Sequence, residues 1–274
     1  MDASEFFNFL DQLLGPARFD WDFCGLQFKS QKKSLRRVAL AVGLTKEVLK
    51  KCVSWKADAL VVHHPLIFVP QKSFDVSHYP ESLLFELYNA QTHLYVAHTN
   101  LDSSTLGASY RAAHEFLKDL EKRGIKAYIA NEIYLEGSEV ALQDYWTEIV
   151  IEDGCSVAVS QIAEYFEKFY DSKPYITAIP KSLEREKRSI HRIVICSGSG
   201  SSLASRDDFD VLITGEIGFH QALDAKERGQ AVLAFGHYET ELCCVKSLGE
   251  YLKKNFDGIE FRVMEDESSR LRLT

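Results

Sequence analysis

The sequence predicts an α/β fold of two related lobes with mixed, largely parallel sheets. Two observations predict it. Apolar, β-branched segments of strand length alternate with segments of helical periodicity along the 274 residues, and this alternation occurs twice with polar residues at matching strand ends. The strands are nearly continuous apolar runs, as expected for parallel sheet that is buried on both faces. We expect a first lobe over 1–125 and a second over 126–274, with a C-terminal helix able to pack back on the first.

The first half begins with an amphipathic helix. Phe6, Leu10, Leu13 and Leu14 recur at helical spacing, and Ser4 is the expected N-cap. The following elements are predicted from apolar runs and helical periodicity, in the order strand 36–43, helix 44–57, strand 58–62, helix 80–91, strand 93–98 and helix 105–123.

The second half begins with less regular segments and then repeats the first pattern. We expect strands over 127–137 and 147–154, a helix over 156–170, and a strand or sheet edge over 173–180. The pattern then returns as strand 191–200 ending in a Gly/Ser loop, strand 210–214, helix 218–229, strand 230–237 and helix 239–256.

A weak internal repeat relates the two halves. DALVVHH (58–64) aligns with DVLITGE (210–216), and YVAHTNLD (95–102) with AFGHYETE (234–241). The alignment places polar residues over one another: His64 over Glu216, His98 over His237, and Asp102 over Glu241. Chance similarity among buried strands is the alternative, but a purely structural repeat would not need polar residues at the same points. We infer that the strand ends of the two lobes face a shared cleft.

Composition argues against several classes of partner. Forty acidic residues against 32 basic ones give a formal charge of −8, which repels a nucleic-acid backbone. No apolar segment approaches the ~20 residues that span a bilayer. The six cysteines form no CxxC pair, and Cys243 and Cys244 are adjacent, which indicates small core side chains in a reducing compartment. We expect a cytoplasmic protein with neither a nucleic-acid nor a membrane partner.

His63 and His64 follow the predicted strand 58–62, and Pro65 keeps the chain extended as it leaves the sheet. Ligands of open α/β sheets bind outside the carboxyl ends of the strands. Imidazoles are common ligands of divalent metals, and two so close together suit a pair of ions. The alternative is structural: His63 caps the strand while His64 bonds a carbonyl.

Two further strand ends carry a histidine and an acid four residues apart. Asp102 follows His98, just before an expected helix start at Ser103 and Ser104, and Glu241 follows His237. If Tyr238 begins a helix, the second pair lies on one helix face, where both side chains can bind the same metal. Alternatively, Glu241 is a first-turn carboxylate that favours the helix dipole. Three such groupings favour a dinuclear site of zinc, iron, manganese or nickel, because two ions ~3.5–4 Å apart share several donors.

Other segments give weaker signals. Glu216 and His220 are four residues apart. They are interpreted either as an acid/base pair or as residues that support the metal ligands. The alternative is an ordinary helix start with a hydrogen-bonded histidine. The loop CSGSGSS (196–202) either cradles an anion or is an ordinary Gly/Ser loop. His78, His93, His114 and His191 are assigned to surface or core. No P-loop and no GxSxG motif occurs.

Six segments occur in an order that resembles the NIF three-like family, whose members are often labelled GTP cyclohydrolase 1 type 2 homologs: WDFCGLQF, ALVVHHPLIF, YVAHTNLDSS, CSGSGSS, DVLITGEIGFHQA and GHYETELCCVKSL. The resemblance covers about residues 21–248. It implies two α/β lobes around a dinuclear metal site and a toroidal homohexamer. The metal ligands that it implies are His63, His64, Asp102, His237 and Glu241. The chain is too short for the domain that some members insert between the lobes.

Two functions follow as hypotheses. The first is a metal-dependent hydrolase of a small molecule, GTP or a related nucleotide, in which metal-activated water attacks and His98 or Glu216 shuttles protons. The second is a non-catalytic metal-binding protein that stores metal, delivers it or acts as a regulatory partner. A weaker third reading is an interaction protein whose metals only tie the lobes together.

Overall fold

The computed structural model describes residues 1–131, 144–184 and 188–270. These residues form two compact units, each with its own β-sheet. Unit 1 comprises Met1–Ser103 and Cys244–Glu267, and unit 2 comprises the described residues of Ser104–Cys243 with Ser268–Arg270. The chain therefore passes between the units after Ser103 and again inside helix α9 (His237–Asn255). Each unit is described by itself.

The sheet of unit 1 has five strands in the order β1-β4-β3-β2-β11, in which β1 is antiparallel to β4 and the other pairs are parallel. Its strands are β1 (Gly25–Phe28), β2 (Arg37–Ala41), β3 (Ala59–Val62), β4 (His93–Val96) and β11 (Glu260–Val263). The helices of this unit are α1 (Ala3–Leu14), α2 (Lys46–Trp55), α3 (Glu81–Asn89), α4 (Thr99–Asp102) and the part of α9 from Cys244 onward. The 3₁₀ helix η2 (Glu267–Ser269) lies across the second boundary between the units.

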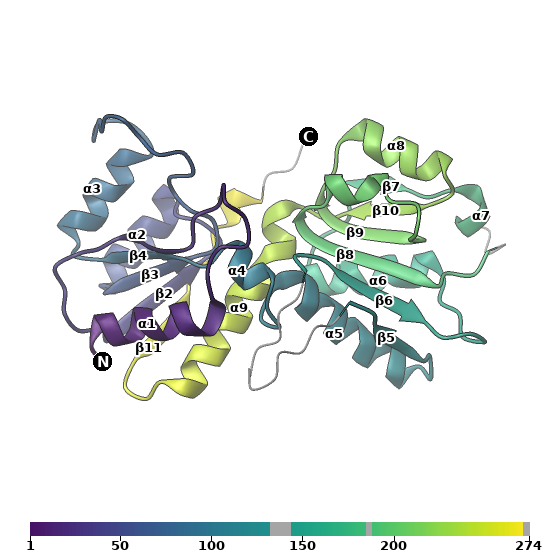
Figure 1. Ribbon diagram of the computed structural model, residues 1–274, viewed down its shortest axis with the longest axis horizontal. Helices are drawn as coiled ribbons and strands as arrows, with labels where there is room; N and C mark the ends of the chain where they lie inside the picture. Colours follow the sequence, from purple (N-terminus) through teal and green to yellow (C-terminus); the bar gives the residue numbers. More distant parts are fainter. Residues whose placement is uncertain (132–143, 185–187, 271–274) are drawn as a thin grey trace. The chain divides into compact units, whose positions relative to one another are not determined.

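Helices cover both faces of this sheet (Figure 1). On one face, Leu49 of α2 and Leu87 of α3 pack in the same core as Leu60 of β3. On the other face, the ring of Phe7 in α1 stacks on Tyr95 of β4, with ring centroids 5.7 Å apart. Burial on both faces explains why the central strands β2, β3 and β4 are largely apolar rather than alternating, as the sequence indicated, whereas the edge strand β11 alternates.

The N-cap predicted for the first helix is wrong by two residues. Asp2 caps α1, because its Oδ1 accepts hydrogen bonds from the backbone N–H groups of Ser4 (2.8 Å) and Glu5 (3.3 Å). Ser4 lies inside the helix, whose first residue is Ala3. A carboxylate satisfies these N–H groups as well as a hydroxyl does, and its charge also favours the helix dipole.

The sheet of unit 2 has six strands in the order β5-β6-β8-β9-β10-β7. They are β5 (Ala127–Ile129), β6 (Thr147–Ile151), β7 (Ile176–Ala178), β8 (Arg192–Ser199), β9 (Val211–Glu216) and β10 (Ala231–Ala234). The helices are α5 (Ala108–Lys122), α6 (Val159–Tyr170), α7 (Lys181–Glu184), α8 (Phe219–Glu227), the 3₁₀ helix η1 (Ser201–Ser205) and the first residues of α9. Of the strand predicted over 127–137, Ala127–Ile129 form β5, the chain bends at residues 130 and 131, and residues 132–137 lie outside the described residues.

The boundary between the units differs from the one predicted after residue 125. Helix α5 precedes that position but packs in unit 2. The ring centroids of Phe116 in α5 and Phe166 in α6 are 5.2 Å apart, and Phe116 lies in the same core as Ile149 and Ile193. An amphipathic helix joins whichever sheet covers its apolar face, and here the strands follow it in the sequence. At the C-terminus, residues Cys244–Glu267 belong to unit 1, where β11 pairs with β2.

The topology confirms that the two units are related. Each has an antiparallel edge strand followed by three parallel strands, in the order β1-β4-β3-β2 in unit 1 and β7-β10-β9-β8 in unit 2. A helix precedes the edge strand in both units, α1 in the first and α6 in the second. The repeat seen in the sequence is thus a repeat of chain path as well as of residues. Among the described residues, no helix is long and apolar enough to cross a lipid bilayer.

The sequence assigned His93 to either the surface or the core, and it lies in the core of unit 1. It is 1% exposed, its Nδ1 accepts a hydrogen bond from the Ser30 backbone N–H (3.1 Å), and its Nε2 donates to the Lys32 carbonyl (2.9 Å). Burial lowers the pKa of His93, although the hydrogen bond to Lys32 opposes that effect.

We expect the stability of unit 1 to fall on mild acidification because of His93. The unfolded chain takes up a proton as the pH falls through the ordinary histidine pKa of ~6.5, whereas the folded protein does so only at lower pH. Stability is therefore retained above that pH and lost between it and the lower folded pKa. Urea unfolding of wild type and His93→Gln between pH 7.5 and 5 measures this, and equal slopes of stability against pH in the two proteins would contradict it.

Candidate metal-binding site

Three histidines of unit 1 lie together at the carboxyl ends of β3 and β4. His63 and His64 directly follow β3, and their backbone N–H groups continue its pairing by donating to the carbonyls of Ala41 (3.1 Å) and Val42 (2.8 Å). His98 follows β4. The centroids of the three rings are 4.8, 5.1 and 5.3 Å apart, and one ligand nitrogen from each ring lies within 4.8 Å of the others. Such a group can hold a metal ion.

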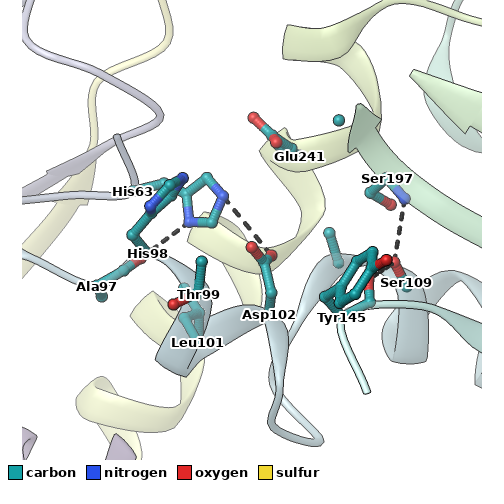
Figure 2. A network of polar contacts seen from close by, with 12 residues as sticks. His63, Ala97, His98, Thr99, Leu101, Asp102, Ser109, Tyr145, Ser197 and Glu241 are labelled. Carbon is teal, nitrogen blue, oxygen red and sulfur yellow. Dashed lines mark hydrogen bonds and ion pairs between the residues drawn. The ribbon is translucent and has the colours of Figure 1, made fainter. Parts of the chain in front are cut away.

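A backbone carbonyl fixes the orientation of His63 (Figure 2). Its Nδ1 is 2.8 Å from the Ala97 carbonyl oxygen, which can only accept, so the proton of the neutral ring is on Nδ1. Nε2 then carries the lone pair that a metal would bind, and it lies 3.6 Å from Oδ1 of Asp102. The side chain of His63 is fully buried, so the ring has little freedom to turn.

Asp102 occupies a different element from the one predicted. The sequence suggested that it precedes a helix starting at Ser103 and Ser104. Instead, it is the last residue of the short helix α4, and α5 begins only at Ala108. Because α4 starts one residue after His98, the short helix turns the chain back and brings the carboxylate to His63.

Asp22 is a residue of this group that the sequence analysis did not identify. Its Oδ1 lies 2.6 Å from Nδ1 of His98, and its Oδ2 accepts a hydrogen bond of 2.5 Å from the Thr99 hydroxyl. Burial raises the pKa of Asp22, but the hydrogen bonds from His98 and Thr99 outweigh that effect and hold the pKa well below its usual range. The carboxylate is therefore ionised and orients the His98 ring. Asp22 belongs to the WDFCGLQF segment and precedes β1, so a search restricted to strand ends missed it.

His98 has two possible roles in this geometry. The sequence favoured it as an acid or base, whereas its ring lies in the same ligand-capable group as His63 and His64. With Nδ1 bonded to Asp22, Nε2 is the nitrogen available to bind a metal or to accept a proton. Both roles require the same ring orientation, which Asp22 provides.

In unit 2, His237 lies between two carboxylates. Helix α9 begins at His237, one residue earlier than supposed, and Nε2 of this residue is 3.0 Å from Oε1 of Glu241 one turn later. Its Nδ1 is 3.2 Å from Oε2 of Glu216 at the end of β9. Burial lowers the pKa of His237, but the negative charges of Glu241 and Glu216 raise it more strongly, to about 9. A metal ion would compete with the bound proton for these atoms.

The pairing suggested between Glu216 and His220 is not the one that the structure contains. Helix α8 begins at Phe219, so Glu216 precedes it and the i, i+4 argument does not apply. Glu216 contacts His237 instead. The ring of His220 lies beside that of Phe219, with ring centroids 5.4 Å apart.

The Gly/Ser segment 196–202 packs its backbone against Glu241. Residues 196–199 are still part of β8, which is irregular between Cys196 and Ser199. The N–H of Gly198 donates to the Thr240 hydroxyl (3.0 Å), so this amide is directed at α9 and not at an anion. A Cβ atom on Gly198 would lie 2.2 Å from Oε1 of Glu241, and its φ of +67° also favours glycine. The glycine therefore lets the strand approach the carboxylate.

Comparison with known proteins gives one family and one fold. The model of the Duf34/NIF3 (NGG1p interacting factor 3) family matches residues 1–269. A GTP cyclohydrolase 1 type 2 homolog of Campylobacter jejuni is 27% identical over 255 residues, which cover 92% of each chain. A protein NIF3 homolog of Schizosaccharomyces pombe is 23% identical over 266 residues, 93% of this chain and 92% of that protein.

Solved structures share the fold. Reduced HcgD from Methanocaldococcus jannaschii has a TM-score of 0.75 at 22% sequence identity, over 97% of this chain and 98% of that one. A protein of Thermus thermophilus has a TM-score of 0.76 at 24% identity, over the same shares of the two chains. The mixed α/β architecture with two sheets is therefore shared with these two solved structures.

We expect Gly198→Ala to destabilise unit 2 and to displace Glu241. Gly154→Ala is the matched control, because Gly154 also has positive φ (+84°) but has no atom within 4 Å of an added Cβ. Both variants carry the conformational cost of ~1–2 kcal/mol, and only Gly198→Ala adds a clash of roughly 1–3 kcal/mol. Urea unfolding measures the difference. Equal destabilisation by the two substitutions would show that the close approach to Glu241 is not required.

Proposed function

Because this chain belongs to the Duf34/NIF3 family, we propose that it binds two divalent metal ions and hydrolyses a small molecule, GTP or a related nucleotide, with metal-activated water. The label GTP cyclohydrolase 1 type 2 homolog, carried by relatives along most of the chain, supports the reaction class. The proposal includes the toroidal homohexamer implied by the sequence resemblance. It involves no nucleic acid.

The donor atoms fit divalent transition metals. Unit 1 offers the imidazoles of His63 and His64 with the carboxylate of Asp102, and unit 2 offers His237 with Glu241. These five residues are the proposed ligands. Imidazole and carboxylate donors suit zinc, iron, manganese and nickel alike. The orientation of His63 by the Ala97 carbonyl is the arrangement expected of a metal-binding histidine, whose second nitrogen donates to a fixed acceptor.

One observation carries the proposal. Three histidines that follow strands β3 and β4 converge at one end of a sheet, and the buried carboxylate of Asp22 is bonded to one of them. Placing three imidazoles side by side is unfavourable if any two are protonated, because like charges repel at these distances. A bound cation removes that repulsion by taking the place of the protons.

The residues around the proposed ligands would control protons. When bound, the ions would supply a water acidic enough to be deprotonated near neutral pH. His98 would accept a proton at Nε2, because Nδ1 is bonded to the ionised carboxylate of Asp22. Glu216 would hold His237 through Nδ1 and so direct Nε2, which makes it a positioning residue in this scheme.

Metal content tests the first part of the proposal. Elemental analysis of protein purified without a polyhistidine tag should find two ions per chain. His64→Asn in unit 1 and His237→Asn in unit 2 should each weaken binding by at least roughly tenfold, since loss of a supporting residue alone costs 10- to 100-fold. His78→Asn is the matched control, because this exposed histidine contacts Asp75 (2.9 Å) outside the histidine group. Protein that takes up no transition metal would end the proposal.

Turnover tests the second part. Metal-loaded protein should hydrolyse one member of a nucleotide panel, and Asp102→Asn should lose the activity, whereas Asp75→Asn should keep it. His98→Gln should lower kcat by roughly 10²- to 10⁴-fold with metal content unchanged, as expected for removal of a general acid or base. Two bound ions without turnover of any nucleotide would instead favour metal storage or delivery.

A further inference from the structure

We propose that exposed aromatic side chains beside His98 form a stacking platform for a planar heteroaromatic ring of the ligand that binds at the histidine group. The platform consists of Trp21 and Phe68, with Phe19 supporting Trp21. The proposal rests on the proposed metal function, because it places the ring next to the metal ligands. It goes further by assigning a part of the ligand to particular residues of unit 1.

The rings of Trp21 and Phe68 both meet His98 edge to face. The Trp21 ring centroid is 6.3 Å from that of His98 with planes at 74°, and the Phe68 centroid is 5.7 Å away with planes at 83°. These side chains come from distant segments, since Trp21 precedes β1 and Phe68 follows the His63–His64 pair. Two aromatic rings from segments far apart in the sequence thus contact the same imidazole.

Both rings remain largely in solvent. Trp21 is 62% exposed and Phe68 is 48% exposed. Phe19 lies parallel to Trp21, with centroids 5.4 Å apart and planes at 10°, which leaves the indole supported but still mostly accessible. Single exposed aromatic residues are normal on protein surfaces, but a group next to ligand-capable side chains marks a binding surface.

The segment that carries Trp21 is fixed in place by hydrogen bonds to residues 98–100. Asp22 accepts from His98 and Thr99, the Arg18 backbone N–H donates to the Thr99 hydroxyl (3.1 Å), and the Asn100 side chain donates to the Gly15 carbonyl (2.9 Å). Asp22, whose carboxylate orients His98, is thus the residue directly after Trp21 in the sequence. Ordering a surface loop around an exposed apolar ring lowers the entropy without burying the ring. The arrangement is accounted for if a ligand ring covers Trp21, since a preordered platform lowers the entropic cost of binding.

The chemistry of the platform defines the class of occupant. Indole and phenyl rings stack on flat π-systems and gain less from saturated rings of the same size. A ligand with a planar heterocycle and a metal-binding or hydrolysable group at its edge would place the heterocycle on Trp21 and the reactive group toward His63, His64 and His98. A second copy of the chain covering the same rings is the competing explanation.

A matched pair of probes tests the platform. Benzohydroxamate and cyclohexanecarbohydroxamate carry the same metal-binding group but differ in whether the ring is planar. Their Kd values are measured by calorimetry on metal-loaded wild type, Trp21→Leu and Phe74→Leu. Phe74 is the control, because it is 64% exposed in the same unit and has no ring contact with His98 among the contacts described. The indole N–H resonance of Trp21 is followed in metal-loaded and metal-free protein, and sedimentation velocity reports the assembly of each variant.

We expect wild type and Phe74→Leu to prefer the planar probe by roughly tenfold, and Trp21→Leu to lose that preference while its affinity for the saturated probe is unchanged. The planar probe should also shift the Trp21 resonance. Equal affinities in wild type, or a preference that survives Trp21→Leu, would overturn the platform. So would a Trp21→Leu variant with altered sedimentation and an intact preference, because that result assigns the rings to a subunit contact.

Failure of the metal proposal gives a different result. If the protein holds no metal, neither hydroxamate binds tightly, and the platform is then judged on metal-free protein. There, a Trp21 shift caused by the planar probe and not by the saturated one supports the platform, and equal or absent shifts overturn it.

Discussion

The hydrogen bond between His63 Nδ1 and the Ala97 carbonyl joins the carboxyl ends of β3 and β4, and the geometry of the histidine group depends on it. The Ala97 N–H donates to the Val62 carbonyl (2.8 Å), so the parallel ladder extends one residue beyond the strands and brings that carbonyl to the ring. Backbone pairing thus determines the tautomer of a side chain. A ring held in this way presents one lone pair in one direction, which is what a metal ligand requires.

The two units of the internal repeat share the same chain path but carry different polar side chains at corresponding strand ends. At corresponding strand ends, unit 1 has His64 where unit 2 has Glu216, and the i, i+4 pair is His98 and Asp102 in one unit and His237 and Glu241 in the other. Imidazoles predominate in unit 1 and carboxylates in unit 2. The spacing also differs, since His98 is the second residue after β4 and His237 the third after β10. The additional residue accompanies Gly236, whose φ of +118° suits the turn from strand to helix.

Carboxylates orient histidines in both units, by different means. Asp22 is supplied by a loop and is kept ionised by its hydrogen bonds to His98 and Thr99. Glu216 is supplied by a strand end, and together with Glu241 it raises the pKa of His237. In each case the paired carboxylate leaves the other ring nitrogen with a defined direction. The loop that supplies Asp22 also carries Trp21, so the orientation of His98 and the position of the aromatic rings share one anchor.

The sequence by itself determined the fold class, the repeat and most of the candidate donors. Apolar runs and helical periodicity are local properties, and residues at strand ends are local neighbours of those runs, as His63, His64 and His237 are. The contact between His237 and Glu241 also follows from a spacing of four on one helix. Only the tertiary structure identified Asp22, because its partner His98 is 76 residues away and no periodicity relates them. The same reason applies to the units, since α5 joined strands that follow it and β11 joined β2 from the other end of the chain. Long-range pairing depends on which apolar surfaces cover one another, and that choice is made only when the whole chain folds.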